Sequence, residues 1–484
     1  MSADFETDYL VVGAGAVGLA FVDALLDEDP DCHVTIVDMH AKPGGHWNDA
    51  YSFVALHQPS AFYGVNSLEF GDDVVDSHGP NKGLYPLASG AEVSAYFTHL
   101  MNRRLLPSGR VSYHPLSRYD GDGSDGHAAF DSILSGKRTN VKVRKKTVDA
   151  TFYKTSVPST HKRQFGVAPG TPMAIPGDLP DLWKRGNDLP AHYAILGAGK
   201  TAMDAGVWLL QAGVDPDDIT WVRPRDSWLI NRTYTQPGPD FFEKVVENQI
   251  AQLNAAAEAK TGDEMFELLG RGGYMLRIDE DVKPEMFHYA TISEGEIDLL
   301  RQIKNVVRKG RVTSVEPGKI VFADDEHSVP GNTLFIDCTA TAVPFDDTRQ
   351  HGPQFRGDTI VLQPLHVPLV TFSAALTAFL EVHFGDDETK NRLGVPAPLT
   401  DTPNTYPLGM LTNFMNRGAW SQNPKIAAWL AKSRLDPTGT TFAKMMAEGD
   451  TRLAVMGGFQ AAIETGIPGL QRLAEAAQAE HQPR

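Results

Sequence analysis

The sequence predicts an α/β fold made of two Rossmann-like domains, the second inserted in the first, followed by a mainly helical C-terminal region. This prediction depends first on a pattern of strand, glycine turn, helix and strand that spans 8–38. The same pattern occurs again at 192–223, so the pattern of the first unit is repeated once within the chain. With 484 residues, the chain is also long enough for two or three domains.

Apolar runs and glycine turns mark the individual elements. In the first unit a strand, a helix and a strand are expected at 8–13, 16–27 and 33–38. In the second unit the same three elements are expected at 192–197, 200–212 and 219–223. Elsewhere the pattern predicts helices at 91–105, 240–270, 294–308 and 369–384, and strands at 111–116, 141–152, 319–323 and 333–338.

Composition limits the classes of function. The formal net charge is −17, whereas nucleic acids and anionic lipids need a basic surface, so neither is expected as a general partner. The two cysteines, Cys32 and Cys338, are far apart and no CxxC occurs, which argues against a redox-active dithiol. No dense group of metal-ligand residues occurs, so no metal is expected. Without a membrane-spanning apolar run or a signal peptide, a cytoplasmic protein is expected.

Gly13, Gly15 and Gly18 form a GxGxxG motif between a predicted strand and a predicted helix. The first glycine permits a tight turn, the second lets the backbone approach a pyrophosphate, and the third lets the helix pack on the sheet. Asp38 follows Gly18 by 20 residues, at the end of the second strand. Its carboxylate can accept hydrogen bonds from ribose hydroxyls and would repel a 2′-phosphate, so the site suits FAD or NAD. The alternative is that Asp38 is a solvated strand-end residue.

A second fingerprint begins at Gly197 and Gly199, with Ala202 in the third glycine position. Alanine is an accepted substitute there, and the motif again follows a strand and opens a helix. The residues between, Lys200 and Thr201, are included with the two glycines as candidate nucleotide contacts.

The second unit lacks an acid at the end of its second strand. Arg223 occupies that place, 21 residues after Ala202, and Arg225 follows closely. A guanidinium there can hold a 2′-phosphate by paired hydrogen bonds, which favours NADPH over NADH. The alternative is that Arg223 and Arg225 pair with carboxylates such as Asp226.

The segment after Asp38 carries a resemblance to a known family. Gly44, Gly45, His46 and Trp47 form a GG-x-W sequence that resembles the class B flavin monooxygenases. That family includes flavin-containing monooxygenases, Baeyer–Villiger monooxygenases and N-hydroxylases. The resemblance implies that Gly44, Gly45 and Trp47 line the flavin of a bound FAD. The alternative for Trp47 is a core aromatic residue.

The polar run at 56–67 follows soon afterwards. Such a run just after a nucleotide-binding unit is more typical of the wall of a site than of a core strand. His57 and Gln58 are therefore the candidates to face the flavin and to act in catalysis. The alternative is a loop histidine and a loop amide whose hydrogen bonds are satisfied locally.

Two strand ends resemble each other and extend the likeness to the two-dinucleotide-binding-domain flavoproteins over 8–345. One runs through Asp149 and Thr151, and the other through Asp337 and Ala340. Each resembles a degenerate form of the Ala-Thr-Gly strand end where that family crosses between its domains. The resemblance implies that Asp337 and Ala340 lie near FAD, and that Cys338 is a small packing residue. The implied domains are FAD-binding at 1–160, NAD(P)H-binding at 161–335, and a return to the FAD domain with a helical cap at 336–484.

One family feature is missing. The class B enzymes carry an FxGxxxH fingerprint just before the second Rossmann strand, but 176–184 contains neither FxG nor histidine. The leading hypothesis is an FAD-dependent, NADPH-using monooxygenase that acts on a small organic substrate with O₂ through a flavin C4a-hydroperoxide. A second is an NAD(P)H:acceptor oxidoreductase without oxygen transfer, and a third is a flavin-binding protein that does not turn over. The weakest candidate flavin contact is Gln363, at the end of a strand-like run.

Overall fold

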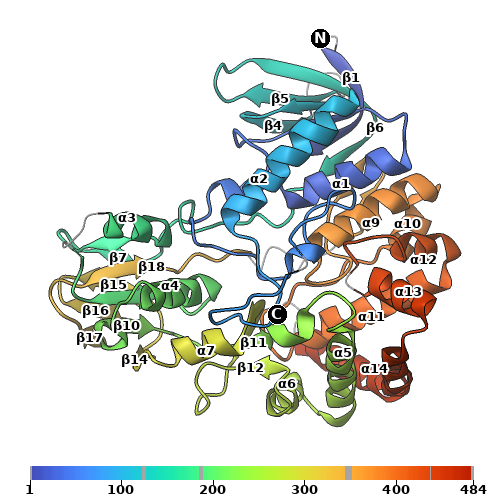
Figure 1. The fold of residues 1–484 in the computed structure, drawn as a ribbon. Helices are drawn as coiled ribbons and strands as arrows, with labels where there is room; N and C mark the ends of the chain where they lie inside the picture. Colours follow the sequence, from blue (N-terminus) through green and yellow to red (C-terminus); the bar gives the residue numbers. More distant parts are fainter. Residues whose placement is uncertain are drawn as a thin grey trace.

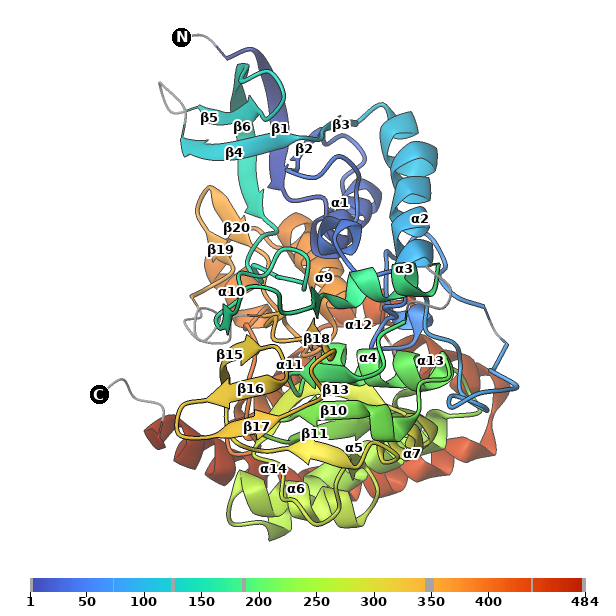
Figure 2. The same cartoon turned by 90° about the vertical axis from the view of Figure 1, so that its left-hand side faces the viewer.

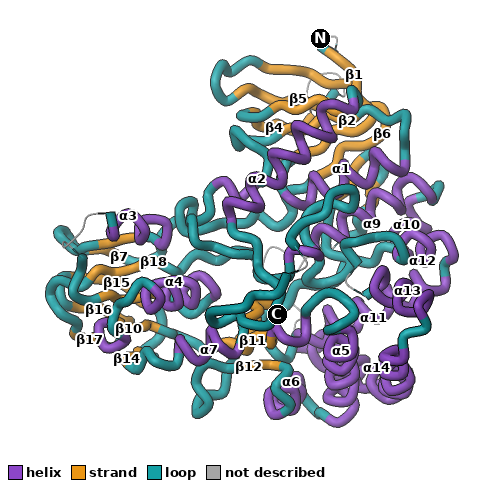
Figure 3. The backbone as a smooth tube through the Cα atoms, viewed as in Figure 1, coloured by secondary structure: helices purple, strands orange, loops and turns teal. Residues whose placement is uncertain are grey.

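The structure is a computed structural model and describes residues 3–72, 74–122, 127–184, 189–343, 352–436 and 438–480. Two lobes, each built around a parallel sheet, lie apart in Figure 1, the first at the top and the second at the lower left. Strands are concentrated in these lobes, whereas helices dominate the C-terminal side (Figure 3). The predicted α/β class with two Rossmann-like units is confirmed.

The sheet of the first lobe has eight strands in the described residues. Its principal path runs β19-β20-β6-β1-β2-β3, and β5 and β4 extend it as antiparallel strands from β6. The strands are β1 (Phe5–Val12), β2 (Val34–Val37), β3 (Val111–His114), β4 (Ser117–Asp122), β5 (Ala128–Ser132), β6 (Arg138–Asp149), β19 (Phe355–Arg356) and β20 (Thr359–Val361). Because β20 pairs in parallel with β6, the chain returns to the first sheet after it has built the second.

The second lobe has a five-stranded parallel sheet in the order β14-β10-β9-β18-β8. The strands are β8 (Met173–Ala174), β9 (Tyr193–Leu196), β10 (Ile219–Val222), β14 (Asn305–Val307) and β18 (Leu334–Asp337). Two smaller sheets flank it, β12-β11-β13 and β17-β16-β15-β7. Their strands are β7 (Gly166–Val167), β11 (Ser227–Asn231), β12 (Met275–Leu276), β13 (Met286–Ile292), β15 (Val312–Glu316), β16 (Lys319–Phe322) and β17 (Glu326–Ser328).

Both parallel sheets have the same topological switch point. From β1 the chain continues to β2 on one side, and β6 pairs on the other side. From β9 it continues to β10 on one side, and β18 pairs on the other. Ligands of open α/β sheets bind outside the carboxyl ends of the strands at such a point. The fold therefore provides two equivalent places for a ligand.

The helices cover the sheets and build the C-terminal side. They are α1 (Ala16–Glu28), α2 (Gly90–Leu100), α3 (Leu179–Trp183), α4 (Lys200–Gln211), α5 (Phe242–Glu258), α6 (Gly262–Arg271), α7 (Glu294–Leu300), α9 (Val370–His383), α10 (Asp387–Leu393), α11 (Tyr406–Gln422), α12 (Pro424–Leu430), α13 (Gly439–Glu448) and α14 (Val455–Glu480). The helix predicted at 294–308 was too long. It ends at Leu300, because the valine-rich run that follows joins the second sheet as edge strand β14.

The core of the first lobe extends into the C-terminal region. Helices α1 and α9 lie side by side in Figure 2, and their apolar residues belong to one buried cluster. Phe21 and Leu25 of α1 and Phe372 and Leu376 of α9 are fully buried in it. Burial of apolar side chains at about 1.5–3 kcal/mol each fixes α9 against the first Rossmann helix. Helix α9 is thus part of the first lobe's core, whereas residues of α11 and α14 belong to a separate buried cluster with α5 and α6.

Candidate dinucleotide sites

The first glycine loop has the geometry that its sequence predicts. Gly13 follows β1 with a φ of +106°, a backbone conformation that residues other than glycine rarely adopt. A Cβ on Gly18 would lie 2.1 Å from the carbonyl oxygen of Gly13, so only glycine lets α1 approach the loop. A Cβ on Gly15, in contrast, would meet only the Cα of Gly45, at 3.7 Å. Gly13 and Gly18 are thus required by the backbone, whereas Gly15 faces space in front of the helix.

The second glycine loop repeats this arrangement. Gly197 has a φ of +127°, and a Cβ there would lie 2.5 Å from the carbonyl oxygen of Cys338. Gly199 has no neighbour within 4 Å of such a Cβ. The thiol of Cys338 is buried, and burial raises its pKa well above the ordinary value, as expected for a packing residue.

The helices that follow both loops begin without a side-chain cap. The N-cap residues Gly15 and Gly199 have nearly identical extended backbones, with φ, ψ of −77°, −179° and −80°, −179°. By comparison, α2 and α7 begin with the capping boxes of Ser89 and Ser293. An uncapped first turn leaves N–H groups that need an acceptor, and the helix dipole favours an anion there. Both loops therefore fit a pyrophosphate.

Asp38 lies beside the first loop, at the end of β2. One carboxylate oxygen, Oδ2, accepts the backbone N–H of Ala14 at 2.5 Å. The other, Oδ1, accepts the backbone N–H of His40 at 2.6 Å and contacts its ring Nδ1 at 3.0 Å. Since each carboxylate oxygen offers two acceptor positions, these contacts leave one on Oδ2. Asp38 is thus a buried, loop-bound carboxylate, not a solvated strand end.

His40 joins two carboxylates in this corner. Its Nε2 lies 2.8 Å from Asp49, and its Nδ1 faces Asp38. Burial alone would lower the pKa of His40, but the hydrogen bonds and charges of Asp49 and Asp38 outweigh it and raise that pKa. His40 was not among the residues singled out in the sequence, because a histidine two residues after a strand has no motif of its own.

The GG-x-W segment lies directly on the first glycine loop. The N–H of Gly44 donates to the carbonyl of Ala14 at 2.8 Å, and a Cβ on Gly45 would lie 2.9 Å from Cα of Gly15. Both glycines have positive φ, 120° and 58°. The indole of Trp47 is half-buried against the first core and donates to the hydroxyl of Tyr63 at 2.8 Å. The two glycines therefore lie against the first glycine loop, and Trp47 shows the packing expected of a core aromatic residue.

His57 and Gln58 lie on the segment that follows, in different environments. The amide Nε2 of Gln58 donates to the carbonyl of Phe62 at 3.0 Å, which satisfies it within its own loop. His57 is an exposed residue, although nearby protein atoms desolvate its ring. Its burial, and then the charge of Lys200, lower its pKa to about 4. His57 is therefore a neutral imidazole at pH 7 that faces the second lobe.

Arg434 fixes the segment 56–67, which the sequence predicts to be the wall of the first site, and it was not among the residues singled out in the sequence. Its guanidinium donates to the carbonyls of Ala61, Tyr63 and Val65 at 2.6, 2.5 and 2.7 Å. The contact joins residues more than 360 positions apart, so no local pattern could reveal it. Through Arg434, the C-terminal region fixes one face of the first site.

Lys200 and Thr201 begin helix α4, but Lys200 is already paired. Its ammonium bonds to Asp204 one turn along the helix and lies 3.9 Å from Glu296. Asp204 also accepts the hydroxyl of Tyr51 at 2.7 Å, and Tyr51 interacts with Thr201. Sequence reasoning missed Tyr51, Asp204 and Glu296, because their meeting depends on how the lobes are arranged.

Arg223 and Arg225 differ in burial and in ion pairing, which the sequence alone could not decide. Arg223 is 2 % exposed, pairs with Asp226 at 2.7 Å and stacks on Trp221 at 4.9 Å. Arg308 approaches Asp226 as well, at 2.8 Å. The ion-pair alternative thus describes Arg223, which has almost no surface for a phosphate. Arg225, two residues further, is exposed.

Asp337 and Ala340 follow β18 beside the second loop. The carboxylate of Asp337 accepts the Nε–H of Arg163 at 2.9 Å and both the N–H and the hydroxyl of Thr339, at 3.1 and 2.6 Å. Ala340 is half-buried. Gln363, at the end of β20, is fully buried, and its amide donates to the carbonyl of Gly352 at 3.0 Å. These residues lie at strand ends, as predicted, but Asp337 is engaged in fixing a turn.

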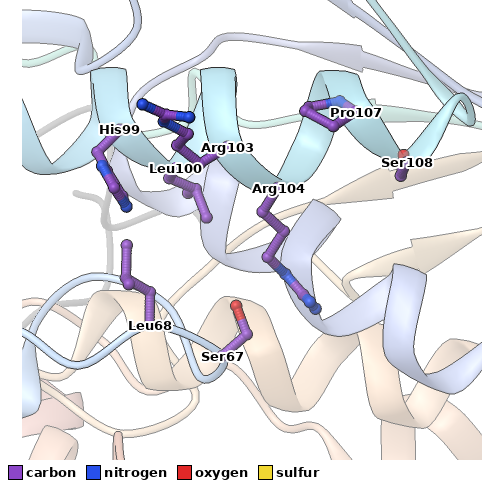
Figure 4. A pocket seen from close by; sticks show the side chains of 8 residues that line it. All are labelled: Ser67, Leu68, His99, Leu100, Arg103, Arg104, Pro107 and Ser108. Atoms are coloured by element: carbon purple, nitrogen blue, oxygen red, sulfur yellow. The ribbon is translucent and has the colours of Figure 1, made fainter.

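A hollow of about 490 Å³ lies elsewhere, between the C-terminal end of α2 with the turns that follow it and the segment of Ser67 and Leu68. Figure 4 shows its lining side chains, which are Ser67, Leu68, His99, Leu100, Arg103, Arg104, Pro107 and Ser108. Arg104 is engaged by Asp23 and Asp27 at 2.6 and 2.8 Å, and Ser67 also bonds to Asp23. Neither glycine loop borders this hollow, so it is separate from the dinucleotide sites.

Fold and loop geometry together define a protein with two Rossmann-type dinucleotide half-sites. A family model, NAD(P)-binding Rossmann-like domain, matches residues 11–67. Protein Rv2000 of Mycobacterium tuberculosis and protein Mb2023 of Mycobacterium bovis are each 40% identical over 481 residues, which covers 99% of this chain and 86% of theirs. The chain belongs to the family of these mycobacterial proteins.

Solved structures are similar to this chain only at low identity and low TM-score. The flavin-containing monooxygenase of Stenotrophomonas maltophilia is 14% identical with a TM-score of 0.40, over 88% of this chain and 99% of that one. The polycyclic ketone monooxygenase of Thermothelomyces thermophila is 11% identical with a TM-score of 0.46, over 99% and 90%. Likeness at this level does not transfer an activity.

Two kinds of feature are absent from the residues that the structure describes. No helix in these residues is both long and apolar enough to span a bilayer. Nor do these residues contain a group of three or more His, Cys, Asp or Glu side chains that could hold a metal ion.

Proposed function

We propose that the protein is an FAD-dependent monooxygenase that uses NADPH and O₂ to oxidise a small organic substrate, with FAD in the first lobe and NADPH in the second. One observation carries the proposal: two glycine-initiated, uncapped helices begin at the switch points of two parallel sheets. Two dinucleotides in one chain bring a hydride donor to a flavin. When bound, FAD would supply the chemistry of hydride acceptance and oxygen reduction.

The residues around the first loop support FAD there. Asp38 is a carboxylate at the ribose position, and it would repel the 2′-phosphate of NADP. Gly44 and Gly45 bring a second backbone segment against the first glycine loop. The resemblance to class B enzymes implies that this segment would line the flavin. Trp47 would support the flavin from behind through its bond to Tyr63.

The second lobe supports a nicotinamide dinucleotide. Gly197 and Gly199 leave the first turn of α4 open to a pyrophosphate, and Lys200 and Thr201 begin that turn. The exposed guanidinium of Arg225 follows β10, at the end where an adenosine ribose would lie. A cation there would favour NADPH, and Arg223 would support it indirectly by holding the turn through Asp226.

The chain's own part in the reaction is to bind, orient and exclude water. His57 is neutral at pH 7, so its ring can accept one hydrogen bond and donate another without adding charge beside the flavin. Arg434 fixes the wall that carries Tyr63, and α9 closes the first lobe behind it. Such alignment and desolvation are the protein's usual contribution to flavin chemistry.

The sequence feature that favours a second candidate is the missing FxGxxxH fingerprint. At that place the chain forms a short 3₁₀ turn (Pro176–Asp178) and α3, with Asp178 bonding back to the N–H of Ile175 at 2.9 Å. An NAD(P)H:acceptor oxidoreductase without oxygen transfer would use the same two sites and would not need the fingerprint.

Turnover with isotopically labelled O₂ separates these candidates. The FAD-loaded enzyme is given NADPH and a panel of small organic substrates, and product oxygen and peroxide are both measured. Label in a product, with NADPH consumption stimulated by that substrate, supports oxygen transfer. Rapid NADPH oxidation that yields only peroxide or reduced quinone supports the acceptor oxidoreductase. A bound flavin that NADPH never reduces supports a protein that does not turn over.

A further inference from the structure

Asp204, on the second Rossmann helix, contacts both lobes at once. One oxygen of its carboxylate bonds to the ammonium of Lys200, at the first residue of α4. The other accepts the hydroxyl of Tyr51, at 2.7 Å, from the first lobe. The side chains of Lys200 and Asp204 are only 11 % and 12 % exposed, so this contact is largely shielded from water.

The segment from Tyr51 to His57 makes contacts with both lobes. Besides Tyr51, the ring of Phe53 stacks on Trp208 of α4 at 5.2 Å, and the hydroxyl of Thr291 bonds to the carbonyl of His57. Two other residues of the segment, Val54 and Leu56, are bonded to the first lobe. The N–H of Leu56 donates to the carbonyl of Ala88, and the carbonyl of Val54 accepts from Gly90, both at 2.9 Å. The wall that carries His57 is therefore held by the nucleotide helix on one side and by the first lobe on the other.

The charges around Asp204 form a balanced buried group. Lys200 and Arg232 are cations, and Asp204 and Glu296 are anions. Burial alone would lower the pKa of Lys200, but the two carboxylates outweigh it and raise that pKa, so the side chain stays charged. Arg232 also bonds to the first lobe through Asn81 at 2.5 Å and the carbonyl of Tyr85. A dianion placed before α4 would compete with Asp204 and Glu296 for Lys200.

We propose that Asp204 is a positioning residue that couples the two half-sites. It holds the ammonium of Lys200 away from the nucleotide, and it holds Tyr51, together with the segment that carries His57, against α4. The inference rests on the proposed nucleotide site in the second lobe. Asp204 then has two separable effects. Through Lys200 it lowers affinity for the nucleotide pyrophosphate, and through Tyr51 it sets the wall that carries His57 beside the flavin.

Two conservative variants separate these effects. Asp204→Asn removes the competing charge but keeps an oxygen for Tyr51, so calorimetric titration should show NADP⁺ bound about tenfold more tightly. Tyr51→Phe removes the tie to the wall but keeps the Lys200–Asp204 pair. Its dissociation constant for NADP⁺ should stay within about twofold, while the rate of flavin reduction at saturating NADPH falls about tenfold.

Tyr9→Phe is the matched control. Tyr9 also donates its hydroxyl to a carboxylate, Glu381 at 3.3 Å, but within the first lobe. This variant should leave both the NADP⁺ affinity and the reduction rate unchanged. Weaker NADP⁺ binding in Asp204→Asn, as a merely structural aspartate would give, overturns the proposal. So does a Tyr51→Phe protein that behaves like Tyr9→Phe.

Hydrogen exchange distinguishes failure of the inference from failure of the proposed function. Amides at 51–57 should exchange faster in Tyr51→Phe than in wild type or Tyr9→Phe, whether or not any nucleotide is present. If wild type binds no dinucleotide but Tyr51→Phe still exchanges faster than wild type at 51–57, the proposed function fails and the attachment of the wall by Tyr51 stands. Unchanged exchange at 51–57 in Tyr51→Phe would show that the bond from Tyr51 to Asp204 does not hold this segment in place.

Discussion

Asp149 and Asp337 occupy equivalent turns at the ends of β6 and β18. Each carboxylate accepts two bonds from the threonine two residues later: Asp149 from Thr151 at 2.8 and 2.6 Å, and Asp337 from Thr339 at 3.1 and 2.6 Å. The residue between them donates its N–H to the carbonyl at the end of the neighbouring strand. Ala150 donates to Val12 of β1 at 3.0 Å, and Cys338 donates to Leu196 of β9 at 2.9 Å. The internal repeat thus extends to the turn that backs each glycine loop.

The first prediction separates a ligand-facing glycine from a packing glycine. Gly15→Ala should fold with nearly wild-type stability, because the new Cβ meets only the Cα of Gly45 at 3.7 Å. The same methyl group occupies the pyrophosphate position, so FAD affinity should fall at least about tenfold. Gly18→Ala should instead lose about 1–3 kcal/mol of stability, because its Cβ would lie 2.1 Å from the Gly13 carbonyl oxygen.

Thermal unfolding and FAD titration on the two variants check this contrast. A Gly15→Ala protein that retains FAD at unit stoichiometry and full affinity would remove the assignment of the first loop. A Gly18→Ala protein as stable as wild type would show that α1 can shift without cost.

The second prediction concerns pH and the corner formed by Asp38, His40 and Asp49. The folded protein raises the pKa of His40 above its ordinary value of about 6.5, because the carboxylates outweigh burial. Stabilisation by the charged imidazole is therefore fully present below about pH 6.5 and is lost as pH rises through the raised folded value. FAD retention should weaken over that window, because the corner orients Asp38.

His40→Gln is the variant that checks it, since glutamine can keep a hydrogen bond but carries no charge. Its FAD affinity and melting temperature should depend less on pH between about 6 and 9 than those of wild type. Equal pH dependence in the two proteins would assign the effect to another group.

Local patterns explain which parts of this fold the sequence revealed. Strand, glycine loop, helix and strand are consecutive, so Gly13, Gly18 and Gly197 were placed by spacing alone and have the predicted backbone. Cys338, which the family resemblance implied to be a small packing residue, lies where two backbone segments meet. By contrast, the predicted helix at 294–308 failed because sheet pairing overrode helical periodicity at β14.

Contacts between distant segments could not be read in this way. Tyr51 and Asp204 are 153 positions apart, and Arg434 meets the 61–65 carbonyls from the far end of the chain. Arg223 shows a second limit. Its spacing favoured a phosphate ligand over the alternative of an ion pair, and burial, which decides between them, follows from tertiary packing.

The third prediction is that both thiols are inert in the folded protein. Burial, followed by the charge of Asp29, raises the pKa of Cys32 to about 11, and burial raises that of Cys338 well above its ordinary value. Alkylation by iodoacetamide at pH 8 should be slower by about a hundredfold or more in native than in unfolded protein, because the thiolate is the reacting form. Mass spectrometry that finds either cysteine rapidly modified in native protein would contradict the packing assignment.

The last prediction revises the basis of nucleotide choice. Arg225 is exposed beside the end of β10, whereas Arg223 is buried against Trp221 and paired with Asp226. Arg225→Ala should raise the KM for NADPH about tenfold and leave NADH kinetics nearly unchanged. The reason is that a 2′-phosphate contact is remote from the hydride and contributes uniform binding. Wild type should therefore prefer NADPH in kcat/KM.

Arg223→Ala should act through stability instead. It leaves Asp226 with Arg308 alone and removes the cation stacked on Trp221, at a cost of roughly 1.5–3 kcal/mol. Both nucleotides should then be affected alike, and the melting temperature should fall, whereas Arg225→Ala should leave that temperature unchanged. The assignment is overturned if Arg223→Ala alone erodes the NADPH preference at unchanged stability. Such a result would mean that the turn opens when nucleotide binds and exposes Arg223 to the phosphate.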